Sequence, residues 1–256
     1  MVLLYIPPVQ NLLRREVTAY ASKATGMQIQ VERIDLRFPL NLLVRGVEVI
    51  QQPDTLLSLE SLNVRVQAWP LLKGKVEVDE VTLSQVAVNS ANLIEGMQIK
   101  GVLGRFFLQS HGVDLSNETA VVNRTELSDT HIQLLMTDTT TTPKDTTASA
   151  PVNWKVNLHQ LKLKNVSFGM KLPADSMKMA AYIGEATIDD AKADLKNQFY
   201  GLKQFLLSGA SASYDTGEAQ PSEGFDASHM AVRNIRIGLD SLLYEGRNMN
   251  LSLIHI

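Results

Sequence analysis

The sequence predicts a mainly β protein, an elongated sheet of repeated strands preceded by one short N-terminal amphipathic helix. Three observations lead to this prediction. Helical spacing of apolar residues occurs once, directly after two prolines near the N-terminus. Strict alternation of apolar and polar residues begins after Gly26 and recurs along the rest of the chain. A six-residue motif, apolar–polar–polar–apolar–polar–apolar, interrupts that alternation repeatedly.

The composition fits a folded chain of one or two domains and excludes several classes of function. The 256 residues are 45% hydrophobic and 20% charged, which suffices for a core. The 24 Lys and Arg residues against 27 Asp and Glu residues leave a net charge of -3, so we expect no nucleic-acid partner. The absence of cysteine excludes disulfides, thiolate catalysis, cysteine-ligated zinc and iron–sulfur clusters.

Both ends of the sequence have the character of cut ends. Residues 1–6 read MVLLYI and stop at Pro7-Pro8, whereas a membrane span needs ~20 apolar residues. A buried N-terminal segment is one interpretation. The other, favoured by the missing charged flank, is that residues 1–8 are the end of a truncated membrane anchor. The last residues, NLSLIHI, stop inside an alternating pattern, so we expect a fragment.

Residues 9–26 are expected to form the helix. Pro7 and Pro8 suit a first turn, because proline lacks the N–H that would have no partner there. Gly26 is a suitable C-terminal stop. We expect the helix to cap an edge of the sheet, and a position at a membrane interface is the weaker alternative. The apolar stripe consists of Val9, Leu12, Leu13, Val17, Tyr20 and Ala24.

The strands carry a repeated change of phase. Met27, Ile29 and Val31 alternate with polar residues, and after the doublet Glu32-Arg33 the apolar series resumes in the other phase. A β-bulge or a break at each doublet would keep one face apolar on both sides of it. Repetition of this kind predicts an elongated, repetitive β-architecture. The copies are VERIDL at 31–36, LESLNV at 59–64, VDEVTL at 78–83, LHQLKL at 158–163 and VRNIRI at 232–237, with looser ones at 183–188 and 202–207.

Two polar stretches interrupt the strands. Residues 137–151, TDTTTTPKDTTASAP, contain almost no large apolar side chain, so we expect a disordered insertion. It would separate a first β-sheet segment at 27–136 from a second, truncated one at 152–256. The stretch 214–229 is expected to be an extended loop.

Limited proteolysis tests the expected insertion. The first cut should fall within 137–151 while the strands on both sides persist, because an unstructured segment fits a protease site most readily. Primary cleavage elsewhere, with 137–151 intact, would contradict the expectation.

The sequence contains no constellation that points to catalysis or metal binding. Its five histidines lack metal-ligand spacing. Ser110-His111 and Ser228-His229 with Asp226 resemble a triad only superficially, because neighbouring residues of a strand point to opposite faces. Gly101 and Gly104 form a GxxG pattern, which we interpret as a tight turn rather than a nucleotide clamp. We expect no enzyme activity, no cofactor and no metal.

Two stretches resemble the AsmA/TamB superfamily. VERIDLRFPLNLLVRGVEV at 31–49 is similar to the start of that family, with Ile34-Asp35-Leu36 matching I-D-L and Val44–Val49 matching V-x-G-V-x-V. The stretch at 56–83 is similar to the strand that follows, a PLL.G turn at 70–74 and then V-x-V-x-x-V-x-L. The resemblance extends over nearly the whole chain and is closest to the N-terminal part of Bacteroides-type translocation and assembly modules of the TamB group. A missing anchor and an abrupt end are the departures.

The resemblance implies a non-enzymatic protein of outer-membrane biogenesis. Members sit in the inner membrane by one N-terminal helix, extend a long β-structure through the periplasm, and support phospholipid transport to the outer membrane or protein assembly in it. The implied partners are phospholipid acyl chains, the inner membrane and an outer-membrane barrel assembly protein. The implied fold is an elongated, curved, U-shaped and groove-like antiparallel sheet.

The apolar face of the sheet is the candidate site. An open apolar groove would hold acyl chains at ~0.8 kcal/mol per buried CH₂. We expect the concave side to include seven residues of two neighbouring strand segments: Leu62, Val64, Val66, Val76, Val78, Val81 and Leu83. A covered β-sandwich, as in a surface or adhesin-like interaction protein, fits the same pattern, and the sequence leaves both open.

Overall fold

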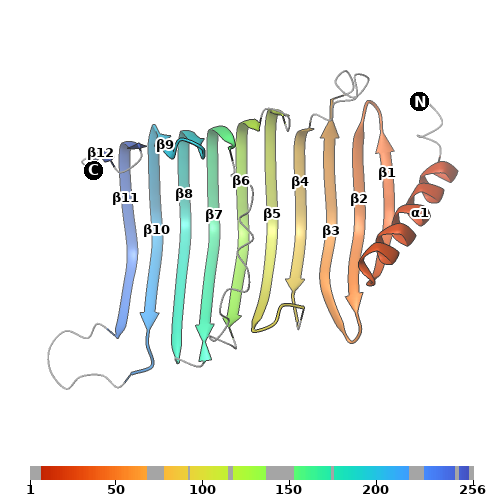
Figure 1. The fold of residues 1–256 in the computed structure, drawn as a ribbon, viewed down its shortest axis with the longest axis horizontal. Helices are drawn as coiled ribbons and strands as arrows, with labels where there is room; N and C mark the ends of the chain where they lie inside the picture. The colour runs from red at the N-terminus through yellow and green to blue at the C-terminus, as the bar shows by residue number, and fades with distance from the viewer. Residues whose placement is uncertain are drawn as a thin grey trace.

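The computed structural model describes residues 7–67, 78–91, 93–114, 118–136, 153–173, 176–218, 228–245 and 248–253. In these residues one helix precedes a single sheet (Figure 1), which confirms the mainly β fold with a short N-terminal helix. The elements are α1 (Pro7–Thr25), β1 (Gln28–Arg37), β2 (Asn41–Gln51), β3 (Asp54–Val66), β4 (Val78–Asn89), β5 (Met97–Asp114), β6 (Thr119–Met136), β7 (Lys155–Leu172), β8 (Met177–Asp194), β9 (Phe199–Leu202), β10 (Gln204–Asp215), β11 (His229–Glu245) and β12 (Asn248–Leu253).

The strands follow one another across the sheet in chain order, with β9 off the main path between β8 and β11. Every described pair is antiparallel except β6 with β7, which is parallel. The expectation of a wholly antiparallel sheet is therefore wrong at this pair. Parallel neighbours need a connection that returns the chain to the other end of the strand. The stretch 137–151, expected to be disordered, falls in that connection and lies outside the described residues.

Helix α1 lies against the edge strand β1, as expected for an edge cap. β1 pairs with β2 on one side only, so the backbone groups of its other edge need partners. Because α1 supplies partners for some of these backbone groups, it also blocks the pairing of this edge with another chain. Three side chains of α1 bond to the backbone of β1: Gln10 Nε2 to Leu36 O at 2.9 Å, Arg14 Nη1 to Glu32 O at 2.7 Å and Ser22 Oγ to Ile29 N at 3.0 Å.

The repeated motif produces a row of corners across the sheet, here called the first corner row. At each corner the ladder loses pairing while the register on both sides stays the same; Val31 pairs with Val47 and Arg33 with Arg45, for example. In several strands the corner residue has a positive φ, as at Gln85, Asp129 and Asn165. The row consists of Glu32, Gly46, Glu60, Gln85, Gly104, Asp129, Asn165, Gly184 and Gly209.

A second corner row crosses the sheet nearer the other strand ends. Asp79 is a β-bulge, because the register of β3 with β4 shifts between Arg65 and Val66. In β7 and β8 the ladder is interrupted at His159 and Asp190, and Asp190 has a φ of +49°. The predicted bulges or breaks at polar doublets are thus confirmed. Glu32-Arg33 and Glu60-Ser61 are breaks with unchanged register, whereas Asp79-Glu80 contains a true bulge.

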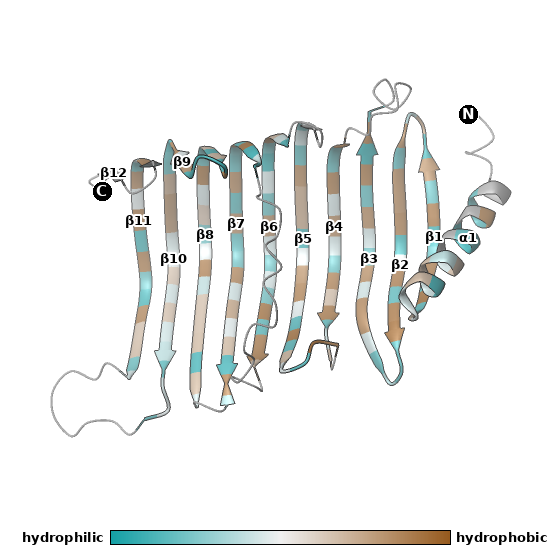
Figure 2. Cartoon of the chain, in the orientation of Figure 1, coloured by the Kyte–Doolittle hydropathy of each residue, from teal (hydrophilic) through white to brown (hydrophobic). Residues whose placement is uncertain are grey.

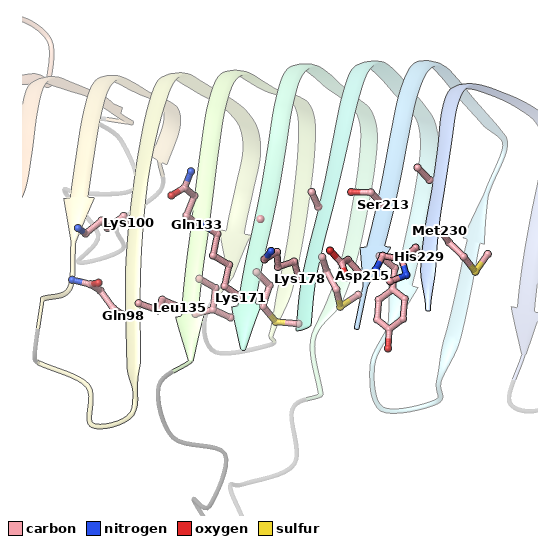
Figure 3. A pocket seen from close by; sticks show the side chains of 17 residues that line it. Gln98, Lys100, Gln133, Leu135, Lys171, Lys178, Ser213, Asp215, His229 and Met230 are labelled. Atoms are coloured by element: carbon pink, nitrogen blue, oxygen red, sulfur yellow. Dashed lines mark ion pairs between the residues drawn. The ribbon is translucent and has the colours of Figure 1, made fainter. Parts of the chain in front are cut away.

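The corners bend the sheet with its apolar face inside. Where a strand bends, two adjacent side chains can point to the same face only on the outside of the bend, because there they diverge. The two residues of the polar doublet occupy these outward positions. Burial agrees, because Thr130 and Ala186, inside the bend, are only 3% and 5% exposed, whereas Arg105 and Lys164, outside it, are exposed. The strands curve over as they cross the corner rows (Figure 3), which is compatible with the expected curved groove.

The GxxG pattern is not a tight turn. Gly101 and Gly104 both lie inside β5, which runs without interruption from Met97 to Asp114. Gly104 belongs to the first corner row, where an added Cβ would come within 2.7 Å of the Asp129 Cβ. The glycine is therefore needed for close approach of two strands rather than for chain reversal.

Replacing Gly46 with valine should destabilise the protein by about 2–3 kcal/mol, measured by urea unfolding. Gly46 has a φ of +57°, and its added Cβ would lie 2.7 Å from the Glu32 Cβ. Gly169→Ala is the matched control, because its added Cβ meets only Gln133 Cγ, at 3.9 Å. Equal stability of the two variants would contradict the corner geometry.

Candidate functional site

Apolar side chains form continuous rows across the inside of the bend. Between the two corner rows, cross-strand partners follow one another from β1 to β11 on the same face, and hydrophobic colour recurs on each of these strands (Figure 2). One row consists of Ile34, Val44, Leu62, Leu83, Phe106, Leu127, Leu163, Ala186, Leu207 and Ile237. The next consists of Leu36, Leu42, Val64, Val81, Leu108, Thr125, Leu161, Ile188, Phe205 and Leu239.

The residues predicted for the site lie in these rows or beside them. Leu62 is opposite Leu83, Val64 is opposite Val81, and Val66 is opposite Val78 beyond the bulge at Asp79. All six are half-buried. Val76 and the expected turn at 70–74 lie outside the described residues. The six described residues therefore lie on one face of two neighbouring strands, as expected.

Most of the apolar surface lies outside the seven residues predicted from the sequence. Leu127, Leu163 and Leu207 occupy the same row as Leu62. The motif copies LHQLKL at 158–163 and LKQFLL at 202–207 carried the signal for two of these strands, since they repeat the pattern of LESLNV at 59–64. The alternation that places Leu62 and Val64 on the apolar face predicts the same face for the corresponding residues of every other motif copy.

The apolar face continues, uncovered, beyond the first corner row. Val88, Ile132, Phe168 and Val232 share one row there and are 38–51% exposed. A hollow of about 320 Å³ lies on this face between Phe168 and Val232. In the described residues no second sheet covers these side chains. A contiguous exposed apolar surface of this kind is typical of a binding site.

The outside of the bend carries paired charges. Lys155 and Asp194 form an ion pair at 3.3 Å across β7 and β8, and Arg65 and Glu80 form one at 3.3 Å across β3 and β4. The hydrogen bond from His159, at 3.1 Å, and the Lys203 ammonium, at 3.7 Å, lower the pKa of Asp190 and outweigh the desolvation that raises it. These ion pairs thus lie outside the bend, on the face opposite the apolar rows.

Because of Asp190, the free energy of unfolding should decrease at acid pH. Its folded-state pKa lies below the ordinary value of 3.8, so the ionised group contributes stability above that value and loses it as the pH falls through the lowered one. Asp190→Asn should therefore flatten the acid limb of a plot of unfolding free energy against pH. An unchanged acid limb would show that the His159–Asp190 contact contributes nothing.

A serine, a histidine and an aspartate meet at the start of β11, but not as the sequence suggested. Ser228 Oγ lies 2.8 Å from His229 Nδ1, and His229 Nε2 lies 3.1 Å from Asp215 Oδ1. The carboxylate beside His229 belongs to Asp215 of β10. Asp226, the aspartate considered from the sequence, lies outside the described residues. The contacts join the ends of β10 and β11. In the described ranges no group of three or more acidic or histidine side chains could hold a metal.

No protein-family model matches the chain, and no curated protein matches it. Over the residues that the structure describes, no helix combines the length and the apolar character that a membrane crossing requires.

Proposed function

We propose that this chain is the N-terminal part of a non-enzymatic envelope-biogenesis protein whose apolar groove carries phospholipid acyl chains. The observation that carries the proposal is the uncovered apolar face, which crosses the sheet from β1 to β11. Only Thr125 interrupts the two central rows with a polar side chain. A soluble protein gains nothing from exposing such a surface unless something apolar binds to it.

The dimensions suit acyl chains lying along the groove, across the strands. The ten strands that contribute to the rows, spaced ~4.8 Å apart, make an apolar path of roughly 45 Å. The base between the corner rows is about five residues, or roughly 16 Å, wide. Each CH₂ group removed from water there contributes ~0.8 kcal/mol. A chain can therefore bind at many positions along the path, as transport requires.

The cellular setting belongs to the same proposal. The resemblance of residues 31–49 and 56–83 to the AsmA/TamB superfamily supports an inner-membrane protein with a single N-terminal anchor and its bulk in the periplasm. Phospholipids would pass along the groove toward the outer membrane, and a barrel assembly protein would be the partner there. The alternative of a closed sandwich in an adhesin-like protein is less well supported, because the described strands form one sheet with an open apolar face.

Phospholipid bound to the purified chain tests the proposal. The protein should copurify with phospholipid, detected by mass spectrometry of an organic extract. Val64→Asp with Val78→Asp should lower the bound amount at least about tenfold, because each carboxylate costs ~2–4 kcal/mol to desolvate against an acyl chain. Ser84→Asp, outside the bend opposite Arg105, is the control and should keep its lipid. A folded wild-type protein without lipid would contradict the proposal.

A further inference from the structure

Methionine side chains gather on the apolar face at one lip of the groove. This lip is the end of the sheet where β6 and β7 finish and β8 begins, beyond the exposed row of Ile132, Phe168 and Val232. Alternation keeps the side chains two and four residues from that row, toward the lip, on the same face. The chain has nine methionines, and six of them lie there: Met97, Met136, Met170, Met177, Met179 and Met230.

The apolar face changes its residue type at this lip. The two central rows between the corner rows consist of Leu, Ile, Val, Phe and Ala with one threonine. Ordering a methionine costs more side-chain entropy than ordering a leucine or an isoleucine, so an acyl-chain surface gains nothing from the exchange. The concentration of thioethers at the lip therefore points to a role for the sulfur atoms themselves.

Four of the six methionines are immediate neighbours in β6, β7 and β8. Met170 is directly opposite Met179, which places their Cβ atoms ~4.5–5.5 Å apart. Met177 is diagonal to Met170, and Met136 lies two residues beyond Leu134, the partner of Met170 in β6, so both are ~7–8 Å from it. The three rotatable bonds of methionine allow these sulfur atoms to converge on one point. We call Met136, Met170, Met177 and Met179 the methionine cluster.

The chemistry of the cluster matches a soft monovalent cation. Thioether sulfur is a soft ligand and selects Cu(I), and the chain has no cysteine whose thiolate would compete for the ion. Lys171 and Lys178, labelled in Figure 3, alternate with the methionines along their strands and therefore lie on the opposite face of the sheet. The thioethers are neutral and the surface around them is apolar, so a single positive charge is cheaper to desolvate there than a double one.

We infer that the methionine cluster binds Cu(I) through its thioether sulfurs. Met179 is 39% exposed and gives the ion access from solvent, whereas Met136, Met170 and Met177 are half-buried. The inference goes beyond the proposed function and does not depend on it, because the ion needs sulfur ligands whereas an acyl chain needs only an apolar surface.

Competition with a chelator tests the inference. The purified chain is titrated without oxygen into the Cu(I) complex of bicinchoninate, whose visible absorbance falls when the protein removes the metal. The wild type should remove about one Cu(I) ion per chain. Met177→Leu with Met179→Leu should abolish the removal, because leucine keeps the volume and the apolar character but lacks the ligand atom. Met27→Leu with Met230→Leu deletes the same number of sulfur atoms outside the cluster, since Tyr214 of β10 separates Met230 from Met179, and should behave as the wild type does.

A second measurement uses the unaltered protein. In a chain labelled with methyl-¹³C methionine, Ag(I), a soft cation of fixed oxidation state, should shift the NMR signals of the four cluster methyl groups and leave those of Met27 and Met230 in place. Zn(II) should shift none of the methionine signals, because its ligands are thiolate, imidazole and carboxylate groups. A wild type that leaves Cu(I) on the chelator, or equal loss of uptake in both double variants, would overturn the inference. The lipid proposal is judged separately, since Met177→Leu with Met179→Leu should copurify with as much phospholipid as the wild type.

Discussion

Replacing Leu207 with aspartate should abolish lipid passage and weaken the outer-membrane barrier, whereas the same change at Leu206 should do neither. Leu207 lies inside the bend between Ala186 and Ile237, in the first apolar row. Desolvating a carboxylate at this position against a passing acyl chain costs ~2–4 kcal/mol. This cost lowers the occupancy of the position by lipid on the order of thirtyfold or more. Sensitivity of cells to a large antibiotic that the outer membrane excludes is the measurement.

The neighbouring leucine is a matched control for chemistry and stability. Leu206 points to the other face, is 39% exposed, and lies between Thr187 and Gly238. Circular dichroism and protein abundance should be the same for both variants. Equal barrier defects in the two variants would show that the face of the sheet does not matter, and would contradict the groove.

Removing the contacts of α1 with β1 should make the protein self-associate. The change is Gln10→Ala with Arg14→Ala and Ser22→Ala, which deletes four hydrogen bonds to the edge strand. Each such bond contributes ~1 kcal/mol, and their loss lets the helix leave an edge that can pair with a second chain. Sedimentation velocity should show a larger share of dimers and higher species for the variant than for the wild type.

The control for this variant alters the opposite side of the helix. Arg15 and Glu16 are exposed and make no described contact with β1, so Arg15→Ala with Glu16→Ala should leave the sedimentation coefficient unchanged. A triple variant with the sedimentation coefficient of the wild type would mean that the polar contacts of α1 do not protect the edge.

Hydrophobic periodicity predicted most of the strands and the corners at their polar doublets, but not the uninterrupted β5. The doublet in VERIDL needs two polar side chains on one face with apolar ones before and after it, and Glu32 indeed lies at a corner with Val31 and Ile34 on either side. The same logic identified the bulge at Asp79. These features are local, because each depends on the face to which consecutive side chains of one strand point.

Features that depend on which strands are neighbours were not predictable in this way. An alternating strand has the same pattern whichever way its neighbour runs, so the parallel pair of β6 and β7 left no signal. Lys171 lies opposite Lys178 only because of the register of β7 with β8. Asp215 and His229 are likewise brought together only by the register of β10 with β11.

The most direct test of the groove is a photo-crosslinking scan along β7. A photoreactive amino acid is placed at each position from 161 to 168, and phospholipid adducts are identified by mass spectrometry. Positions 161, 163, 166 and 168 should capture lipid and positions 162, 164, 165 and 167 should not, because the phase changes at the corner residue Asn165. Adducts at both sets alike, or at neither set in a folded protein, would contradict an apolar groove that follows the inside of the bend.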